Sequence, residues 1–286
     1  MKVFAFLDLD HPVVAWGAYR GILVSSNAEY PQPQCPVSMM FAGILLHQNN
    51  TRLHNELLLE KYRQLHFTKR ISRLAGMYFF EDRRTAELAS EWGGHFSSEN
   101  LAEFELFPTE TYSRHDSNWI SYAPRCESGR IKGENWIAKY WLGEPYPGRT
   151  PVWELLVQGR AAICGTELRN RAYNVISNQF PESLSILEIS RIAAHVGSDL
   201  GCVSAWLVRE DHCSFTLSFM LDMRDADQPE FLEKVRQYDG PLNQIDLAIG
   251  GENFMLPDFR KFSSTIAVKE GLEDPFIFSI HRNVKI

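Results

Sequence analysis

The sequence predicts a soluble α+β protein. Short apolar runs of strand length are interspersed with segments of helical periodicity, and no internal repeat organises them. Hydrophobic residues make up 44% and charged residues 23% of the 286 residues, as in ordinary globular proteins. The apolar runs are shorter than the roughly 20 residues that cross a bilayer, so we expect no membrane partner.

Charge and cysteine usage narrow the class of protein further. The net charge of −7 disfavours a nucleic acid or an anionic membrane held by charge alone, although a local basic groove stays open. The five cysteines are scattered without a C-x-x-C pair, which argues against a zinc site and a disulfide framework. The N-terminus has no signal-peptide pattern, and we expect a cytoplasmic protein.

The first part of the chain reads as strands separated by helices. Residues 3–7 form a buried strand, and the apolar run 41–47 is also of strand length. Helical periodicity covers 53–65. Gly93-Gly94 ends a second expected helix, over 83–92. The remaining elements expected here are a proline-rich loop at 30–38, a strand over 76–80 and a strand over 101–107.

The second part begins with a polar, irregular stretch at 108–132 and continues as a further α+β arrangement. Pro181 interrupts the pattern, so we expect a first domain over 1–180 and a smaller α+β extension over 181–286. The elements expected after residue 132 are helices over 133–142, 166–176 and 184–196, strands over 152–157, 202–208 and 214–221, and a capped helix that begins at 227–230.

A glycine followed by aromatic residues, Gly76-Met77-Tyr78-Phe79, is the strongest hint of a ligand site. Tyr78 offers a ring face and a hydroxyl at a strand end, which suits a flat heteroaromatic ligand. Leu46-His47 precedes this segment by about thirty residues, and Glu154 follows it within the apolar strand 152–157. A buried, unpaired acid is costly, so Glu154 either points to solvent at an edge or serves a site.

This order of motifs over about residues 40–160 resembles the ADP-ribosyltransferase superfamily, in particular its poly-ADP-ribose-polymerase-like branch with a His-Tyr-Glu triad. The resemblance implies a split mixed β-sheet with flanking helices and NAD as the substrate. His47 would bind the ribose of NAD, and Tyr78 would stack on nicotinamide beside Gly76 and Phe79. Glu154 would hold the ribose 2′-hydroxyl and stabilise the oxocarbenium-like charge as nicotinamide leaves.

The implied activity is NAD-dependent transfer of ADP-ribose to a macromolecular acceptor, protein or nucleic acid, or to water. Small members of this fold often act as toxins or defence factors, and an inhibitory partner protein would accompany such a role. The family usually follows its histidine with glycine and a small hydroxyl residue, whereas this chain has Gln48-Asn49. That departure favours an alternative, a catalytically silent binding module on the same fold.

Other acidic pairs have weaker interpretations. Glu103 and Glu105 would share one face of a strand, which is typical of arginine-modifying transferases but more often a solvated face. Asp8 and Asp10 resemble the nucleophile strand of haloacid-dehalogenase-like phosphatases, but His11-Pro12 replaces the expected Gly-Thr. A turn that ends a strand is the simpler interpretation. His47 and Tyr78 likewise have structural interpretations, as a satisfied histidine and a core aromatic.

Overall fold

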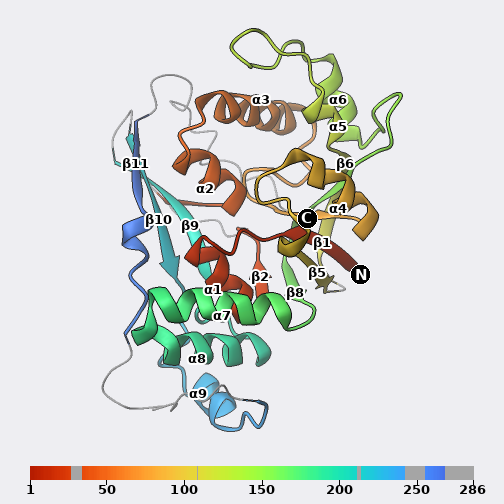
Figure 1. Cartoon of the computed structure of the whole chain (residues 1–286). Helices are drawn as coiled ribbons and strands as arrows, with labels where there is room; N and C mark the ends of the chain where they lie inside the picture. The colour runs from red at the N-terminus through yellow and green to blue at the C-terminus, as the bar shows by residue number, and fades with distance from the viewer. Residues whose placement is uncertain (27–33, 108, 211–213, 242–254, 268–286) are drawn as a thin grey trace.

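The computed structural model describes residues 1–26, 34–107, 109–210, 214–241 and 255–267, and they form an α+β fold with two β-sheets (Figure 1). The predicted α+β class is confirmed. Every strand pair among these residues is antiparallel, so the expected mixed sheet is wrong.

The larger sheet has seven strands in the order β2-β8-β5-β1-β4-β7-β6. Its strands are β1 (Lys2–Phe6), β2 (Ile22–Val24), β4 (Met77–Phe80), β5 (Leu101–Leu106), β6 (Thr111–Asp116), β7 (Trp153–Gln158) and β8 (Arg160–Ile163). The smaller sheet has four strands in the order β11-β10-β9-β3. They are β3 (Gln34–Val37), β9 (Val203–Arg209), β10 (Ser214–Leu221) and β11 (Ser264–Ala267).

Helices cover both sheets. In Figure 1, α1, α7 and α8 lie beside one another below the larger sheet, while α3 and α6 lie at its upper end. The helices are α1 (Pro12–Arg20), α2 (Met39–Leu46), α3 (Asn50–His66), α4 (Arg83–Ala89), α5 (Asn118–Ser121), α6 (Asn135–Leu142), α7 (Glu167–Gln179), α8 (Leu184–His195) and α9 (Pro229–Arg236). None of the helices in the described residues combines the length and apolar character that crossing a membrane requires.

Both faces of the larger sheet are packed because its strands carry apolar residues at successive positions. On β1, Val3 and Ala5 enter the largest hydrophobic cluster, whereas Phe4 lies in a separate cluster on the other face. The largest cluster extends from Val3 to Phe259. β3 also pairs with β9, so strands from before and after Pro181 share one sheet. The division at residue 181 stays a prediction.

Three expected segments differ from the structure. Residues 34–37, within the expected proline-rich loop 30–38, form β3, which pairs with β9. Residues 41–47, expected as a strand, lie mainly in α2, whose first turn is capped by the Ser38 hydroxyl accepting from the Phe41 amide. An apolar run of this length does not distinguish a strand from a buried helix, and the cap decides between them. Within the expected irregular stretch 108–132, β6 and α5 form.

Helix α3 forms where helical periodicity is expected, but charged side chains make up much of its buried face. Leu53 is buried, whereas Leu65, at the end of the periodic segment 53–65, is 66% exposed. The helix instead buries Glu56, Glu60 and Arg63. Because these positions are four and three residues apart, they form one stripe along the helix. Charged groups placed in such a stripe must find partners inside the protein.

Candidate functional site

Two of the three predicted catalytic residues lie on neighbouring strands. β4 pairs with β7 so that Tyr78 lies opposite Leu156 and Phe80 opposite Glu154. Side chains alternate between the two faces of a strand, so Tyr78, Phe80 and Glu154 share one face. The structure therefore brings Tyr78 and Glu154 to the same side of the sheet.

Arg73, in the turn before β4, connects the two residues. Its Nη1 donates to Glu154 Oε1 at 2.5 Å and to the Tyr140 hydroxyl at 2.7 Å. Its guanidinium carbon lies 5.0 Å from the centroid of the Tyr78 ring. The Tyr78 hydroxyl in turn donates to the Arg73 carbonyl at 2.7 Å. These contacts join a ring, a cation and a carboxylate into one cluster.

The Glu154 carboxylate is bonded at both oxygens. Oε1 accepts from Arg73 and from the Tyr140 hydroxyl, the latter at 2.5 Å, and Oε2 accepts from the Ser117 hydroxyl at 2.7 Å. The Glu154 side chain is only 9% exposed. Hydrogen bonds to a charged acceptor are shorter and stronger than neutral ones. The acid is thus held in one position by three donors from different elements.

The polar stripe of α3 completes the cluster. Arg73 Nε and Nη2 donate to the Glu56 carboxylate at 2.8 and 3.1 Å. Farther along α3, Glu60 and Arg63 form an ion pair at 2.7 Å whose side chains are both 0% exposed. The Ser72 hydroxyl also donates to Glu60.

We call this set the buried polar network: Glu56, Glu60, Arg63, Ser72, Arg73, Ser117, Tyr140 and Glu154. It holds three carboxylates and two guanidiniums. With all five groups ionised, the network carries one excess negative charge. Such an imbalance is costly in the interior unless every lone pair has a donor, and the hydroxyls of Ser72, Ser117 and Tyr140 supply further donors.

The environment shifts the pKa values of the network in the expected directions. Burial raises the pKa of Tyr140 well above its usual range, and the Glu154 carboxylate adds to this effect, so the hydroxyl stays protonated and donates. Burial acts to lower the pKa of Arg73, but the adjacent carboxylates of Glu154 and Glu56 outweigh it, and the pKa of Arg73 is raised. The guanidinium therefore stays charged.

His115 on β6 borders the network. Its ring stacks on that of Tyr140 with centroids 4.7 Å apart, and Nδ1 lies 2.8 Å from the Tyr140 carbonyl oxygen. Because a carbonyl only accepts, Nδ1 carries the proton and Nε2 accepts from Ser113. Burial lowers the pKa of His115 to about 4, so the ring is neutral at neutral pH.

His47 lies apart from this cluster. It is exposed and caps the C-terminus of α2, and no contact in the described residues joins it to Tyr78 or Glu154. Gln48 adopts a left-handed backbone with φ of 49°, and the Asn49 side chain accepts from the Arg52 amide at the start of α3. Gln48-Asn49 therefore builds the turn between two helices, and the expectation that His47 ends a strand is wrong.

Gly76 and Phe79 were expected to help hold the cofactor, but the turn and the core around them explain both residues. A Cβ on Gly76 would lie 2.7 Å from Ile71 Cγ2, so glycine permits the close approach of the turn to β4. The Phe79 side chain points away from Tyr78 because neighbouring residues on a strand face opposite sides. It is 2% exposed and packs against Phe104 in the largest cluster.

The other acidic pairs match their simpler interpretations. Glu105 is exposed, and Glu103 forms an ion pair with Lys2 at 2.7 Å, as on a solvated strand face. Asp8 and Asp10 are exposed in the turn that follows β1.

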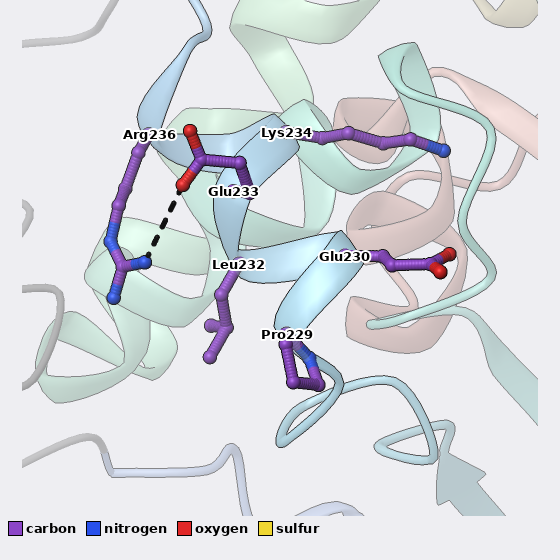
Figure 2. Close-up of a pocket in the computed structure, with 6 residues that line it drawn as sticks. All are labelled: Pro229, Glu230, Leu232, Glu233, Lys234 and Arg236. Carbon is purple, nitrogen blue, oxygen red and sulfur yellow. Dashed lines mark ion pairs between the residues drawn. The ribbon is translucent and has the colours of Figure 1, made fainter.

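A shallow hollow on α9 lies away from the network. Figure 2 shows its lining side chains, which all come from this one helix, with an ion pair between Arg236 and Glu233 at 3.8 Å. None of the lining residues belongs to the buried polar network. The hollow therefore adds nothing to the candidate site.

Sequence reasoning missed most of the network. Tyr140 lies in the segment 133–142 expected as a helix, Ser117 lies in the stretch 108–132 expected to be irregular, and no expectation covered Arg73. One signal was present: Glu56, Glu60 and Arg63 recur at helical spacing within an otherwise leucine-rich helix. A stripe of charged residues beside the apolar stripe of a helix indicates either a solvated face or a buried network. Only the tertiary structure distinguishes the two.

Part of the chain matches a known protein family. Residues 33–172 match the model of the DUF2441 family, described as a protein of unknown function. The matched segment contains every residue of the buried polar network, as well as Tyr78 and His115. No curated protein matches the chain.

Proposed function

We propose that this protein is an NAD-dependent ADP-ribosyltransferase built on an ADP-ribosyltransferase-like fold. The observation that carries the proposal is the common face of Tyr78 and Glu154 on paired strands, with Arg73 in contact with both. Tyr78 and Glu154 come from two of the motifs that carry the family resemblance. His47 takes no part in this site.

The proposed reaction breaks the bond between nicotinamide and ribose. Nicotinamide leaves with the bonding electron pair, the acceptor's nucleophile bonds to the exposed ribose carbon, and its proton passes to solvent. A fixed carboxylate stabilises the cationic ribose of the transition state more than neutral ground-state ribose. Glu154 would supply that carboxylate, and the Tyr78 ring would face the nicotinamide.

Substrate binding requires a change in the bonds of Glu154. The carboxylate is enclosed, so a ribose hydroxyl would have to replace one of its present donors. Ser117 is the simplest group to displace, because it is uncharged and is the single donor to Oε2 in the part of the chain that the structure describes. This exchange conserves the number of hydrogen bonds at the carboxylate.

The acceptor is a protein or a nucleic acid. We further propose a cytoplasmic role as a toxin or defence factor with an inhibitory partner protein; this part rests on the family resemblance.

Nicotinamide release tests the proposal. The purified chain is incubated with nicotinamide-labelled NAD, with and without cell lysate, beside Glu154→Gln and the matched control Glu81→Gln. Glu81 is an ion-paired glutamate that is 36% exposed and lies outside the network. We expect release by the wild type and by Glu81→Gln, and a loss of about 100-fold or more in Glu154→Gln. If the wild type releases no nicotinamide in either condition, the proposed transferase activity is refuted.

One observation favours a second candidate, the catalytically silent binding module: both oxygens of Glu154 already have donors within the protein. Calorimetric titration with NAD separates the candidates. A silent module that keeps the pocket binds NAD without releasing nicotinamide, whereas the transferase consumes it. Equal release by wild type and Glu154→Gln would keep the activity but reject this site.

A further inference from the structure

An exposed aromatic surface with flanking cations lies on α5, α6 and the loop between α6 and β7. Tyr122, just after α5, is 44% exposed, and the half-buried Tyr146 lies beside it with ring centroids 5.8 Å apart. The Arg149 guanidinium lies 3.7 Å from the centroid of Tyr122. The exposed Lys139 lies 5.5 Å from the ring of Trp119. We call Tyr122, Lys139, Tyr146 and Arg149 the aromatic–basic surface.

A buried carboxylate fixes the loop that carries half of this surface. Asp116 is 0% exposed; its Oδ2 accepts from the Tyr146 amide at 2.8 Å and its Oδ1 from the Val152 amide at 3.0 Å. Asn118 on α5 donates to the Thr150 carbonyl at 2.9 Å. The loop is therefore bonded at three points to the end of β6 and to α5.

Trp119 supports the surface from below. It is 7% exposed, and its ring packs edge-on against Tyr146 with centroids 4.9 Å apart. Its indole N–H donates to the Glu144 carbonyl at 2.8 Å. A surface held in place before binding loses little conformational entropy when a ligand arrives.

The surface lies in a locally basic part of an acidic chain. Residues 118–151 contain five arginines and lysines but three glutamates, giving a net charge of +2 against −7 for the whole protein. Charges more than about 10 Å away are largely screened at 0.1 M salt. The nearby cations therefore dominate the potential that a bound anion would experience.

We propose that the aromatic–basic surface binds single-stranded nucleic acid. Unpaired bases stack on aromatic rings and on guanidinium planes, and basic side chains pair with the phosphates between them. The Tyr122 ring with the Arg149 guanidinium over it offers such a platform, and Lys139 and Arg149 can contact the backbone. An acidic peptide would match the cations but would leave the exposed rings unused, so nucleic acid fits the whole surface better.

The same elements hold Glu154, which connects this surface to the candidate site. Ser117 directly precedes α5, Tyr140 lies on α6, and both donate to the Glu154 carboxylate. In Figure 1, α5 and α6 lie together at the end of the larger sheet that carries β6. If the proposed function holds, the bound strand is the acceptor of ADP-ribose; binding itself does not depend on that function.

Fluorescence anisotropy of the full chain without NAD tests the proposal. The probes are labelled oligodeoxythymidine and oligouridine of about 12 nucleotides, a length within the range that such surfaces cover. We expect saturable binding to at least one probe, weakened about tenfold by Tyr122→Leu. We expect Arg149→Ala to weaken binding and to lower the salt dependence by about one phosphate contact, a slope change of about 0.7.

Two matched controls separate this surface from general effects. Lys234→Ala on α9 removes one charge elsewhere, and Tyr112→Leu removes an aromatic residue that is 52% exposed on β6. Both should bind like the wild type, and circular dichroism confirms that each variant is folded. Absence of binding to both probes overturns the proposal. The proposal is also overturned if the surface variants and the control variants lose the same affinity for the probes. Binding of polyglutamate as tight as binding of the probes overturns it as well.

Discussion

Loss of the Arg73 side chain should destabilise the fold more than loss of any surface cation. Arg73 is the shared partner of Glu56 and Glu154, and its side chain is 6% exposed. In Arg73→Met the aliphatic volume is kept, but two buried carboxylates lose their counterion. Removing one partner of a buried ion pair typically costs about 3–5 kcal/mol. That is a large part of the roughly 5–15 kcal/mol that stabilises a domain.

Urea denaturation followed by tryptophan fluorescence measures this cost, since the chain has seven tryptophans. Arg160→Met is the matched control: Arg160 pairs with Asp199 at 2.8 Å, like Arg73 with Glu56, but the two side chains are 38% and 33% exposed. We expect the control to lose about 1 kcal/mol or less. A loss in Arg73→Met no larger than in the control would refute the reasoning.

The pH dependence of the stability of Arg73→Met tests whether buried charge causes the loss. Without the guanidinium, the two buried carboxylates have no counterion, and burial penalises the charged form of a carboxyl group. That cost is relieved when the folded protein takes up protons at lower pH. The stability difference from the wild type should therefore shrink as the pH falls from neutral towards about 4.5. A constant difference would show that packing, not charge, is the cause.

Three further predictions concern single positions, each measured by urea denaturation. Burial lowers the pKa of His115 to about 4 in the folded protein, so the unfolded state binds the proton at a higher pH. This group alone should lower the free energy of unfolding of the wild type by about 3 kcal/mol as the pH falls from 6.5 to 4. His115→Gln should therefore lose less stability over this range. Gly76→Ala should cost about 1–3 kcal/mol through its clash with Ile71, whereas Gly43→Ala, with nothing within 4 Å, should stabilise α2. Gln48→Gly should raise stability by up to about 1 kcal/mol by relieving the left-handed backbone, and a decrease would contradict this.

The longer apolar strands were predictable from the sequence, whereas short strands such as β2 and β8 and the strand that buries polar residues were not. The expected strands 3–7, 76–80 and 152–157 overlap β1, β4 and β7 because their apolar runs satisfy both faces of a buried sheet. β6 was missed because its buried residues are all polar: Ser113, His115 and Asp116. Their burial depends on partners from α6 and the following loop, which no local pattern reveals.

The residues of the candidate site were likewise predictable only where a local pattern in the sequence marks them. Tyr78 and Glu154 were found because each interrupts or ends an apolar strand, a local signal. Arg73 was not found, since an arginine in a turn is normally solvated and its two carboxylate partners lie 17 and 81 residues away. His47 was misplaced because the apolar run before it forms a helix, so the residue at its end faces solvent instead of a sheet.

The excess negative charge of the network bears on whether Glu154 serves stability or function. Glu56 alone would neutralise Arg73, so the fold does not need a second carboxylate at this guanidinium. A glutamine at position 154 would keep an acceptor for Arg73 and Tyr140 and could donate to Ser117, while removing the surplus charge. Functional groups are commonly retained at a cost in stability. We therefore expect Glu154→Gln to be within about 1 kcal/mol of the wild type or more stable, because Glu56 still pairs with Arg73 and the surplus buried charge is removed. A variant that loses activity but no stability would mark Glu154 as functional, and a loss comparable with that of Arg73→Met would mark it as structural.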